Sequence, residues 1–507
     1  MAQSIPNVSP DLFEFVNSSK HIHDEKFKTK PRGYFTDAFI RFKKNKSSVV
    51  AAFIIGFLIL FSIFSPIISP YTVNDKDNTY TNTPPFIESL ADKNLGIFDG
   101  SRRFRSLNEK SIAKYNAIGI ETGYNPFISQ PETYEVEEKH RGQTVLKTFY
   151  TAKLNCYYMV GAEFLTVSYE EFKTIQNFQN ETGIQVILPY IADTTSSTDA
   201  DAWYVVDQKG NPVYDAEGNF IKNYSTDASK AGPIAYESKR IAGDDGSYIY
   251  SWGKSGSLNI RVCYYNYYQY LNGMVPNHIM GTDEYGRDLF DAIGTGARFS
   301  LVFAVLVSAI NLTIGAVYGA IQGYYGGAVD LAMDRVSDVL SGVPSIVVMT
   351  LFKLHLSQKI GVFPSILFAF VLTGWIGMAA LTRKQFYRFK SQEYIMAART
   401  LGASDKRLMF KHIFPNSLGT MVTSCALVIP GVISSETSLT YLGIINLSTV
   451  VGTSIGELME CGQRAMASAP HAMLFPALFI SLLLISFNLF GNGLRDAFNP
   501  STRGVED

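Results

Sequence analysis

Long uncharged apolar runs constrain this chain more than any other feature. The first covers residues 48–68, and the others follow residue 298, separated by short polar or basic segments. As a helix with 1.5 Å rise per residue the first run is ~31 Å long, which matches the hydrocarbon core of a bilayer. Residues 72–275 are polar and contain no such run. The sequence therefore predicts an α-helical polytopic membrane protein of about six spans, with a large domain inserted between the first and second.

Basic residues predict the orientation of the spans. They concentrate in residues 26–46, before the first run, and in 383–416, between two later runs. Lys and Arg favour the cytoplasmic side, so both termini and 383–416 are predicted inside, which is an N-in/C-in topology. Residues 72–295 are then outside. A cleaved signal peptide is disfavoured by the long basic leader and by the lack of a small-residue cleavage site.

The inserted polar block is predicted to be an α+β extracytoplasmic domain. Residues 168–180 carry aromatic and aliphatic side chains at helical spacing, whereas 203–224, 248–250 and 258–265 favour short strands. The chain has four cysteines, too few and too scattered for a disulfide scaffold or a zinc site. Cys156 and Cys263 are the two in the domain. A disulfide between them and two buried free thiols are equally compatible with the sequence.

Residues 392–416 combine positive charge with a helix–break–helix pattern. Four residues share one apolar face of the first helix: Tyr394, Ala397, Ala398 and Leu401. Gly402 follows at once and is predicted to have a positive φ, because helices commonly end in a left-handed glycine. Pro415 marks the entry to the next span.

This stretch resembles the cytoplasmic coupling loop of ABC-importer permeases. The family pattern is Glu-Ala-Ala, three residues, Gly, nine residues and Ile-x-Leu-Pro. Here it reads Met396-Ala397-Ala398, Gly402 and His412-Ile413-Phe414-Pro415. Met396 replaces the usual Glu, so any polar contact of that Glu is absent or moved, and His412 replaces the usual Ile.

A second motif narrows the resemblance to the C-type subunit of oligopeptide/dipeptide importers. Residues 278–288, HIMGTDEYGRD, are similar to the LGTDELGRD signature that precedes the second span in that branch. The matching positions form an outer signature: Gly281, Thr282, Asp283, Gly286, Arg287 and Asp288.

The resemblance implies a transporter complex in a bacterial plasma membrane. The partners would be a B-type permease subunit forming a heterodimer, two cytoplasmic ABC ATPase subunits and an extracytoplasmic peptide-binding lipoprotein. The chain has no P-loop, so it is predicted not to be an enzyme; ATP and magnesium would bind to the ATPase subunits, and neither a cofactor nor a metal to this chain. Six residues are predicted to couple it to the ATPases: Glu393, Ala397, Ala398, Arg399, Gly402 and Pro415.

Asn311, Glu436 and Asn488 are predicted to lie on the translocation path. Polar groups within a span are costly unless they face protein or water. Ser and Thr can bond the backbone of their own helix, which is the favoured interpretation for the hydroxyl residues, whereas an amide is less easily satisfied there. Glu436 could equally be a solvated helix end.

The predicted division of the chain follows from these assignments. It comprises a cytoplasmic segment 1–47, a first transmembrane helix 48–71, an extracytoplasmic domain 72–277, a permease core 278–500 with five further helices, and a tail 501–507. Tyrosines at 264–270, just before the second span, are assigned either to strand packing or to contact with a peptide or a binding protein.

Other function classes explain less of the sequence. A secondary transporter would need buried ionisable residues for ion coupling, and the apolar runs contain almost none. A receptor anchored in the membrane would need one span only. The prediction is therefore an importer of oligopeptides or dipeptides; another solute, such as a nickel chelate or a short glycan, is the alternative.

Overall fold

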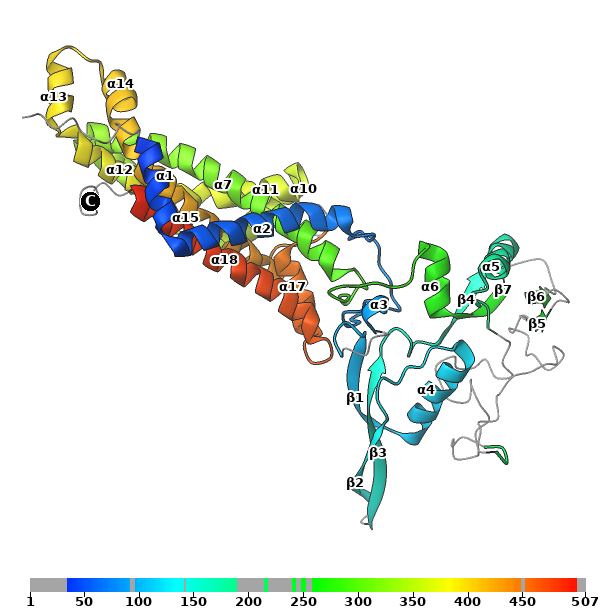
Figure 1. The fold of residues 1–507 in the computed structure, drawn as a ribbon. Coiled ribbons are helices and arrows are strands. Elements are labelled where there is room, and N and C mark those ends of the chain that lie inside the picture. Colours follow the sequence, from blue (N-terminus) through cyan, green and yellow to red (C-terminus); the bar gives the residue numbers. More distant parts are fainter. Residues whose placement is uncertain are drawn as a thin grey trace, which may run out of the picture.

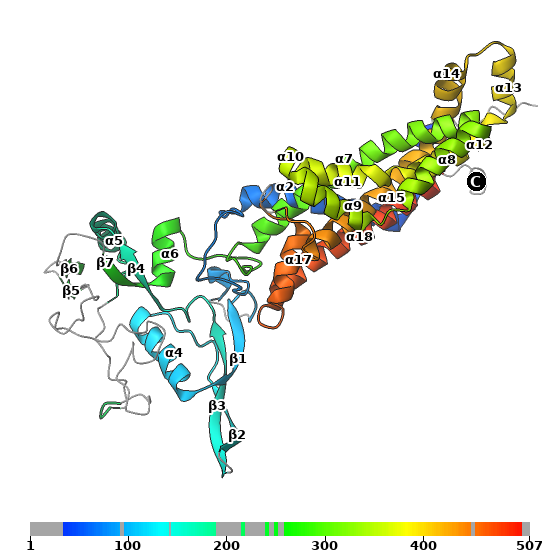
Figure 2. The same ribbon diagram turned by 180° about the vertical axis from the view of Figure 1, so that it is seen from behind.

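A helical bundle and an α+β domain lie at opposite ends of an elongated molecule (Figures 1 and 2). The structure is a computed structural model, and it describes these residues: 34–91, 96–140, 143–188, 214–217, 239–242, 248–251, 258–447 and 452–498. The short helices of the predicted coupling stretch, α13 and α14, project from the end of the bundle that is farthest from the domain.

In the part of the chain that the structure describes, five helices are long and apolar enough to cross a membrane. They are α2 (Lys46–Ile68), α7 (Leu289–Tyr325), the continuous pair Val362–Lys390, the helix Asp405–Tyr441 and α18 (Pro470–Phe498). Their length and composition agree with the predicted helical polytopic membrane protein.

The remaining predicted span is bent. A single straight helix over the apolar run 336–354, which contains Pro344, would give the sixth span. Instead, α8 (Gly327–Ser341) ends before Gly342, and a second helical stretch, Ser345–Ile360, begins after Pro344 at an angle of 72°. Gly342 and Pro344 both favour a helix boundary. Counting this bent pair as one span gives up to six.

A glycine stripe fixes two helices of the bundle. Gly315, Gly319 and Gly323 of α7 face α12 (Ile376–Lys390), and a Cβ at any of them would lie 2.2–2.7 Å from a backbone oxygen of α12 or of its N-cap residue. Only glycine permits this approach. α12 leads directly into the predicted coupling stretch, so α7 and that stretch are joined by close backbone packing.

The inserted block contains helices and strands, as predicted. A three-stranded antiparallel sheet has the order β1-β3-β2, and a second pair joins β4 to β7. The strands and helices of the block are β1 (Ser101–Leu107), β2 (Glu132–His140), β3 (Gln143–Asn155), β4 (Ala162–Val167), β5 (Lys239–Ala242), β6 (Tyr248–Ser251), β7 (Leu258–Cys263), α3 (Glu88–Ala91), α4 (Glu109–Thr122), α5 (Tyr169–Thr182) and α6 (Tyr264–Asn272).

Two local predictions for this domain are confirmed, the helix over 168–180 and the strand over 248–250. The helix expected over 168–180 is α5, and Ser168 caps it by accepting a hydrogen bond from the Glu171 backbone N–H at 3.2 Å. The strand expected over 258–265 ends at Cys263, and α6 begins at the next residue. The prediction was therefore wrong for the last two residues of that range. The strands predicted over 203–224 lie outside the described residues, apart from 214–217.

Buried side chains decide two open questions about the domain. Cys156 and Cys263 are free, buried thiols, and burial raises the pKa of each to about 11. Tyr265, Tyr267 and Tyr268 of α6 are also buried, in two aromatic-rich clusters of the domain core. These tyrosines serve packing, although in a helix rather than in the strand that the sequence suggested.

Candidate functional site

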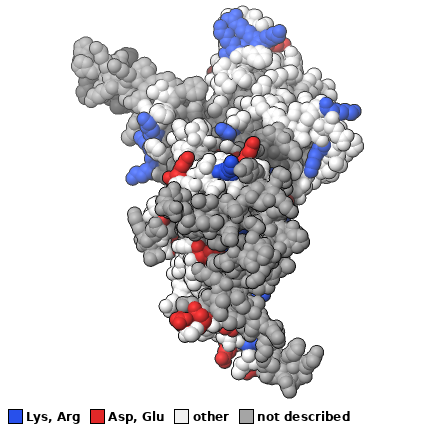
Figure 3. Space-filling view, turned by 90° about the vertical axis from the view of Figure 1, so that its right-hand side faces the viewer, with Lys and Arg blue, Asp and Glu red and all other residues white. Residues whose placement is uncertain are grey.

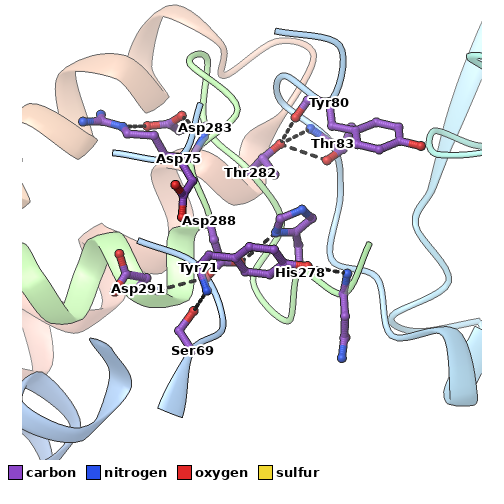
Figure 4. A network of polar contacts seen from close by, with 12 residues as sticks. Ser69, Tyr71, Asp75, Tyr80, Thr83, His278, Thr282, Asp283, Asp288 and Asp291 are labelled. Atoms are coloured by element: carbon purple, nitrogen blue, oxygen red, sulfur yellow. Dashed lines mark hydrogen bonds and ion pairs between the residues drawn. The ribbon is translucent and has the colours of Figure 1, made fainter. Parts of the chain in front are cut away.

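The outer signature is bonded to the chain that leaves the first span. The backbone N–H of Asn82 donates to Asp283 O at 2.8 Å, and that of Thr282 donates to Thr83 O at 3.0 Å. The Thr282 hydroxyl donates to Tyr80 O at 2.6 Å (Figure 4). Segments about 200 positions apart in sequence therefore meet in one network, which we call the outer junction: residues 77–86 with 278–288.

Two glycines of the signature are required by this contact. Gly286 has a φ of +71°, and a Cβ there would lie 1.9 Å from the carbonyl oxygen of Asp77. Gly281 has a φ of +78°, and its Cβ would lie 2.4 Å from Thr83 O. A side chain at either position would both strain the backbone and separate the two segments.

Buried charges attach the outer junction to the start of α7. Arg287 Nε donates to Asp283 Oδ2 at 2.7 Å, with both side chains almost fully buried. His278 Nδ1 lies 2.9 Å from Asp288 Oδ1, and Asp288 Oδ2 accepts the Asp291 backbone N–H at 3.0 Å, which caps α7. Figure 4 shows these side chains converging between the domain and the bundle. The domain is thus fixed to α7 rather than tethered to it.

At the opposite end of the bundle, α13 (Glu393–Thr400) exposes its apolar face. Leu401 is 88% exposed and Met396 51%, and Tyr394 and Ala397 are exposed as well, whereas Ile395 alone on this helix is buried, at 1%. Gly402 has the predicted positive φ, +83°, and a Cβ there would meet nothing within 4 Å. Contiguous exposed apolar surface of this kind is common at protein interaction sites.

Polar contacts hold α13 in place. Arg399 Nη2 donates to the Tyr324 hydroxyl at 3.2 Å, and that hydroxyl donates to Asp405 of α14 (Asp405–Arg407). Tyr324 belongs to the last turn of α7. Glu393 and Pro415 are exposed, and Pro415 occupies the first turn of α15 (Phe414–Tyr441). Of the predicted coupling residues, Arg399 thus bonds to the last turn of α7, and Ala398 packs against the cluster that contains Tyr324.

A second set of contacts ties the bent pair to the same end. Arg383 of α12 donates through Nη2 to Asp330 Oδ2 at 2.7 Å and through Nη1 to Asp334 Oδ1 at 2.8 Å. The Tyr387 hydroxyl also donates to Asp330, and Gln322 Nε2 donates to Asp334 Oδ1 at 3.1 Å. We call this set the inner clamp. It fastens α8 to α12 and α7 immediately before the coupling stretch.

Lys and Arg gather at this end of the molecule. Figure 3 shows them at the top of the view, where α13 and α14 lie in Figure 1, while most Asp and Glu in view lie lower, over the domain. The basic residues of 383–416 are Arg383, Lys384, Arg388, Lys390, Arg399, Lys406, Arg407 and Lys411.

The three residues predicted for the translocation path lie in different surroundings. Asn311 is 3% exposed, has no partner for Oδ1 and lines a cavity of about 110 Å³ with Ser308, Ser424 and Cys425. Glu436 is 1% exposed and accepts the Ser300 hydroxyl at 2.8 Å, so the interpretation as a solvated helix end is wrong. The three residues do not meet in one cavity of the described structure.

Asn488 departs from the expectation for an amide. It is exposed, and its Nδ2 donates to the backbone oxygen of Leu484, one turn earlier in the same helix, at 2.8 Å. The assumption that an amide is not satisfied locally was therefore wrong here. Thr313 and Thr350 bond their own helices at 2.8 Å each, as expected for hydroxyl residues.

Sequence patterns missed the residues that support the coupling stretch. Tyr324, Asp330 and Arg383 come from helices that are separate in sequence, and no local spacing links them. The sequence identified Arg383 only as one of the basic residues of 383–416 that predict the orientation of the spans. The small-residue stripe of α7 was the one available signal that α7 packs against another helix.

Comparisons with known proteins cover the bundle and the first span. Residues 289–504 match the model of the binding-protein-dependent transport system inner membrane component, and 33–85 match that of the N-terminal TM domain of oligopeptide transport permease C. Neither match includes residues 86–288.

Individual relatives agree with these matches. The chain is 38% identical over 227 residues to the oligopeptide transport system permease protein OppC of Bacillus subtilis, covering 45% of this chain and 73% of that protein. It is 36% identical over 228 residues to the dipeptide transport system permease protein DppC of the same species, covering 45% and 70%. The glutathione transport system permease protein GsiD of Escherichia coli is 33% identical over 241 residues, covering 48% and 78%.

Proposed function

Because this chain belongs to the binding-protein-dependent transport system inner membrane components, we propose that it is the C-type permease subunit of an ATP-driven importer of oligopeptides or dipeptides. The names of the oligopeptide and dipeptide relatives support the substrate class. A nickel chelate or a short glycan, the alternative solutes, finds no support among the relatives described above.

The exposed apolar face of α13 carries this proposal. A permease needs no reactive site of its own, but it must receive work from an ATPase at a defined surface. Tyr394, Met396 and Leu401 present apolar surface at the end of the bundle, and Ala397 lets a partner backbone approach closely. We propose that this face docks onto a cytoplasmic ATPase subunit, which binds ATP and magnesium.

α7 provides the route for transmission. Its 37 residues make a rod of about 55 Å, long enough to connect both ends of the bundle. Its first turn is bonded to the outer junction and its last turn to α13 and α14, while the glycine stripe fixes α12 along its side. A displacement of α13 would therefore reach the outer junction through one rigid element. The inner clamp would move the bent pair at the same time.

The orientation belongs to the same proposal. The basic coupling end lies in the cytoplasm and the inserted domain outside, with the N-terminus and the C-terminus both cytoplasmic. The complex contains a B-type permease as a heterodimer partner, two ATPase subunits and a peptide-binding lipoprotein, in the plasma membrane of a bacterium.

Reconstitution tests the proposal. The chain, expressed with candidate B-type, ATPase and binding-protein chains from the same genome, is purified through a tag on this chain and placed in vesicles. The proposal expects co-purified ATPase and ATP-dependent uptake of labelled peptide. Purification of the chain without any ATPase, or uptake that is independent of ATP, would refute it.

A further inference from the structure

A cavity of about 740 Å³ opens between the outer junction and the helix α17 (Ile455–Arg464). The residues that line it come from the chain after the first span at 73–76, the signature turn at 284–287, residues 443–446, Gly452 and α17 itself. Its volume falls in the range of small-molecule sites. Nothing in the proposed function requires a cavity here.

The cavity wall carries balanced charge. Three of its residues are cations and three are anions: Lys76, Arg287, Arg464, Glu284, Glu457 and Glu460. Arg464 is already paired, because Nε donates to Glu284 Oε2 at 3.0 Å and Nη1 to Glu460 Oε1 at 2.6 Å. This pairing holds the pKa of Glu284 below its usual range.

The other charges keep unused bonding capacity. Arg287 is 2% exposed, and its Nη2 has no hydrogen-bond partner among the described residues. Glu457 lies 3.6 Å from Arg287 Nη1, and its buried Oε2 also has no partner there. Burial raises the pKa of Glu457, as expected for a carboxylate with too few donors.

Lys76 is a further free cation in this wall. It is exposed and forms no ion pair within the described part of the chain; its Nζ lies 5.4 Å from the centre of the Tyr285 ring. The Arg287 guanidinium lies 5.0 Å from the same ring. The buried guanidinium of Arg287 and the exposed ammonium of Lys76 therefore both border the Tyr285 ring. The carboxylate of Glu457, with its unpartnered Oε2, lies beside Arg287.

We propose that this cavity binds a short zwitterionic peptide, with its carboxylate at Lys76 and Arg287 and its ammonium at Glu457. Arg464, Glu284 and Glu460 are paired with one another, and Arg287 is paired with Asp283. Among the described residues of the wall, the ammonium of Lys76 and the unpartnered Oε2 of Glu457 are therefore left for the two ends of a zwitterion. A peptide held here would bridge the signature turn, the chain after the first span and α17. The charges of the wall favour a zwitterion, and the choice of a peptide as that zwitterion rests on the proposed function.

Direct binding to the transporter tests the site. The complex is placed in lipid nanodiscs without binding protein or ATP, and the binding of radiolabelled trialanine is measured by equilibrium dialysis. A matched probe, N-acetyl-trialanine amide, has the same length but no terminal charge. The site predicts saturable binding of trialanine and at least tenfold weaker binding of the blocked peptide.

Substitutions then locate the bound peptide. Lys76→Met and Glu457→Gln are each expected to weaken trialanine binding at least tenfold, whereas Lys173→Met, an exposed change on α5, leaves it unchanged. Lys76 is exposed, so its substitution does not threaten the fold. Absence of saturable binding to the wild type overturns the site, as does equal binding of the blocked peptide or full binding by both cavity variants. ATP-dependent uptake, measured separately, reports on the proposed function.

Discussion

The outer junction and the coupling end are built in opposite ways. At the outer junction, backbone hydrogen bonds, required glycines and buried ion pairs join the domain to α7. At the coupling end, α13 buries Ile395 and partly buries Ala398, while Tyr394, Ala397 and the adjoining Leu401 are exposed, and the ion pairs of the inner clamp are partly exposed. The contacts of the first region join segments of this chain, whereas the second exposes apolar surface that the proposed function assigns to a partner.

This difference separates stability from function along the molecule. Substitutions at the outer junction should act mainly on folding, because they separate segments that are already in contact. Substitutions at the coupling end should leave the fold nearly intact and act on assembly or transmission. Each of the following predictions sharpens or breaks that contrast.

The largest effect on stability is expected from Gly286→Val. The substitution adds a side chain at a φ of +71° and places its Cβ against Asp77 O. We expect it to cost about 3–5 kcal/mol, the sum of backbone strain and overpacking. Thermal unfolding of the purified chain measures it. Gly183→Val is the control, with a φ of +73° and nothing within 4 Å of its Cβ; equal destabilisation by both would contradict the close contact.

A smaller effect is expected from Arg383→Ala in the inner clamp. The substitution removes both hydrogen bonds to α8 and should cost roughly 1–2 kcal/mol, because the arginine is partly exposed. Stimulated ATPase activity of the complex should fall much further than basal activity. Arg383→Lys should be intermediate, since an ammonium cannot bond both carboxylates with fork geometry. Normal stimulation in Arg383→Ala would show that the clamp plays no part in transmission.

The smallest effect on stability is expected from Leu401→Ser. The side chain is 88% exposed, so the unfolding free energy should change by less than about 0.5 kcal/mol. Recovery of ATPase with the tagged chain should nevertheless fall severalfold, because the docking surface loses an apolar contact. Leu146→Ser, a similarly exposed change in β3 of the domain, should leave recovery unchanged. Full ATPase recovery with Leu401→Ser would break the contrast.

Sequence patterns predicted those parts of the fold that depend on neighbouring residues. The helix at 168–180, the end of α13 at Gly402 and the long apolar spans all follow from local periodicity, capping or hydropathy. Long-range contacts had no such signal. Arg383 and Asp330 are 53 positions apart, and Thr83 and Thr282 are 199 apart.

Prolines show why the bent span was not predicted. Pro66, Pro430 and Pro476 lie inside continuous helices, whereas the chain breaks at Pro344. A missing N–H and a fixed φ are common to all four, so proline alone does not decide between a kink and a break. Gly342 directly follows the last residue of α8 and lies two residues before Pro344, so it favours the end of α8. The angle of 72° between the two halves is a tertiary outcome that hydropathy does not encode.

Gly402→Val tests the central claim, that the coupling stretch transmits the work of ATP hydrolysis. The position is exposed with a φ of +83° and open space around its Cβ, so valine strains the backbone by about 1 kcal/mol or more without a clash. Relief of that strain reorients α13 relative to α7. The matched control is Gly273→Val, with a φ of +68° and equally open space at the end of α6 in the domain. Both variants are compared with the wild type in paired ATPase and uptake assays in vesicles. Gly402→Val should keep basal ATP hydrolysis, lose its stimulation by peptide-loaded binding protein, and show little uptake. Gly273→Val should resemble the wild type in both assays. Normal stimulation together with normal uptake in Gly402→Val would contradict the account.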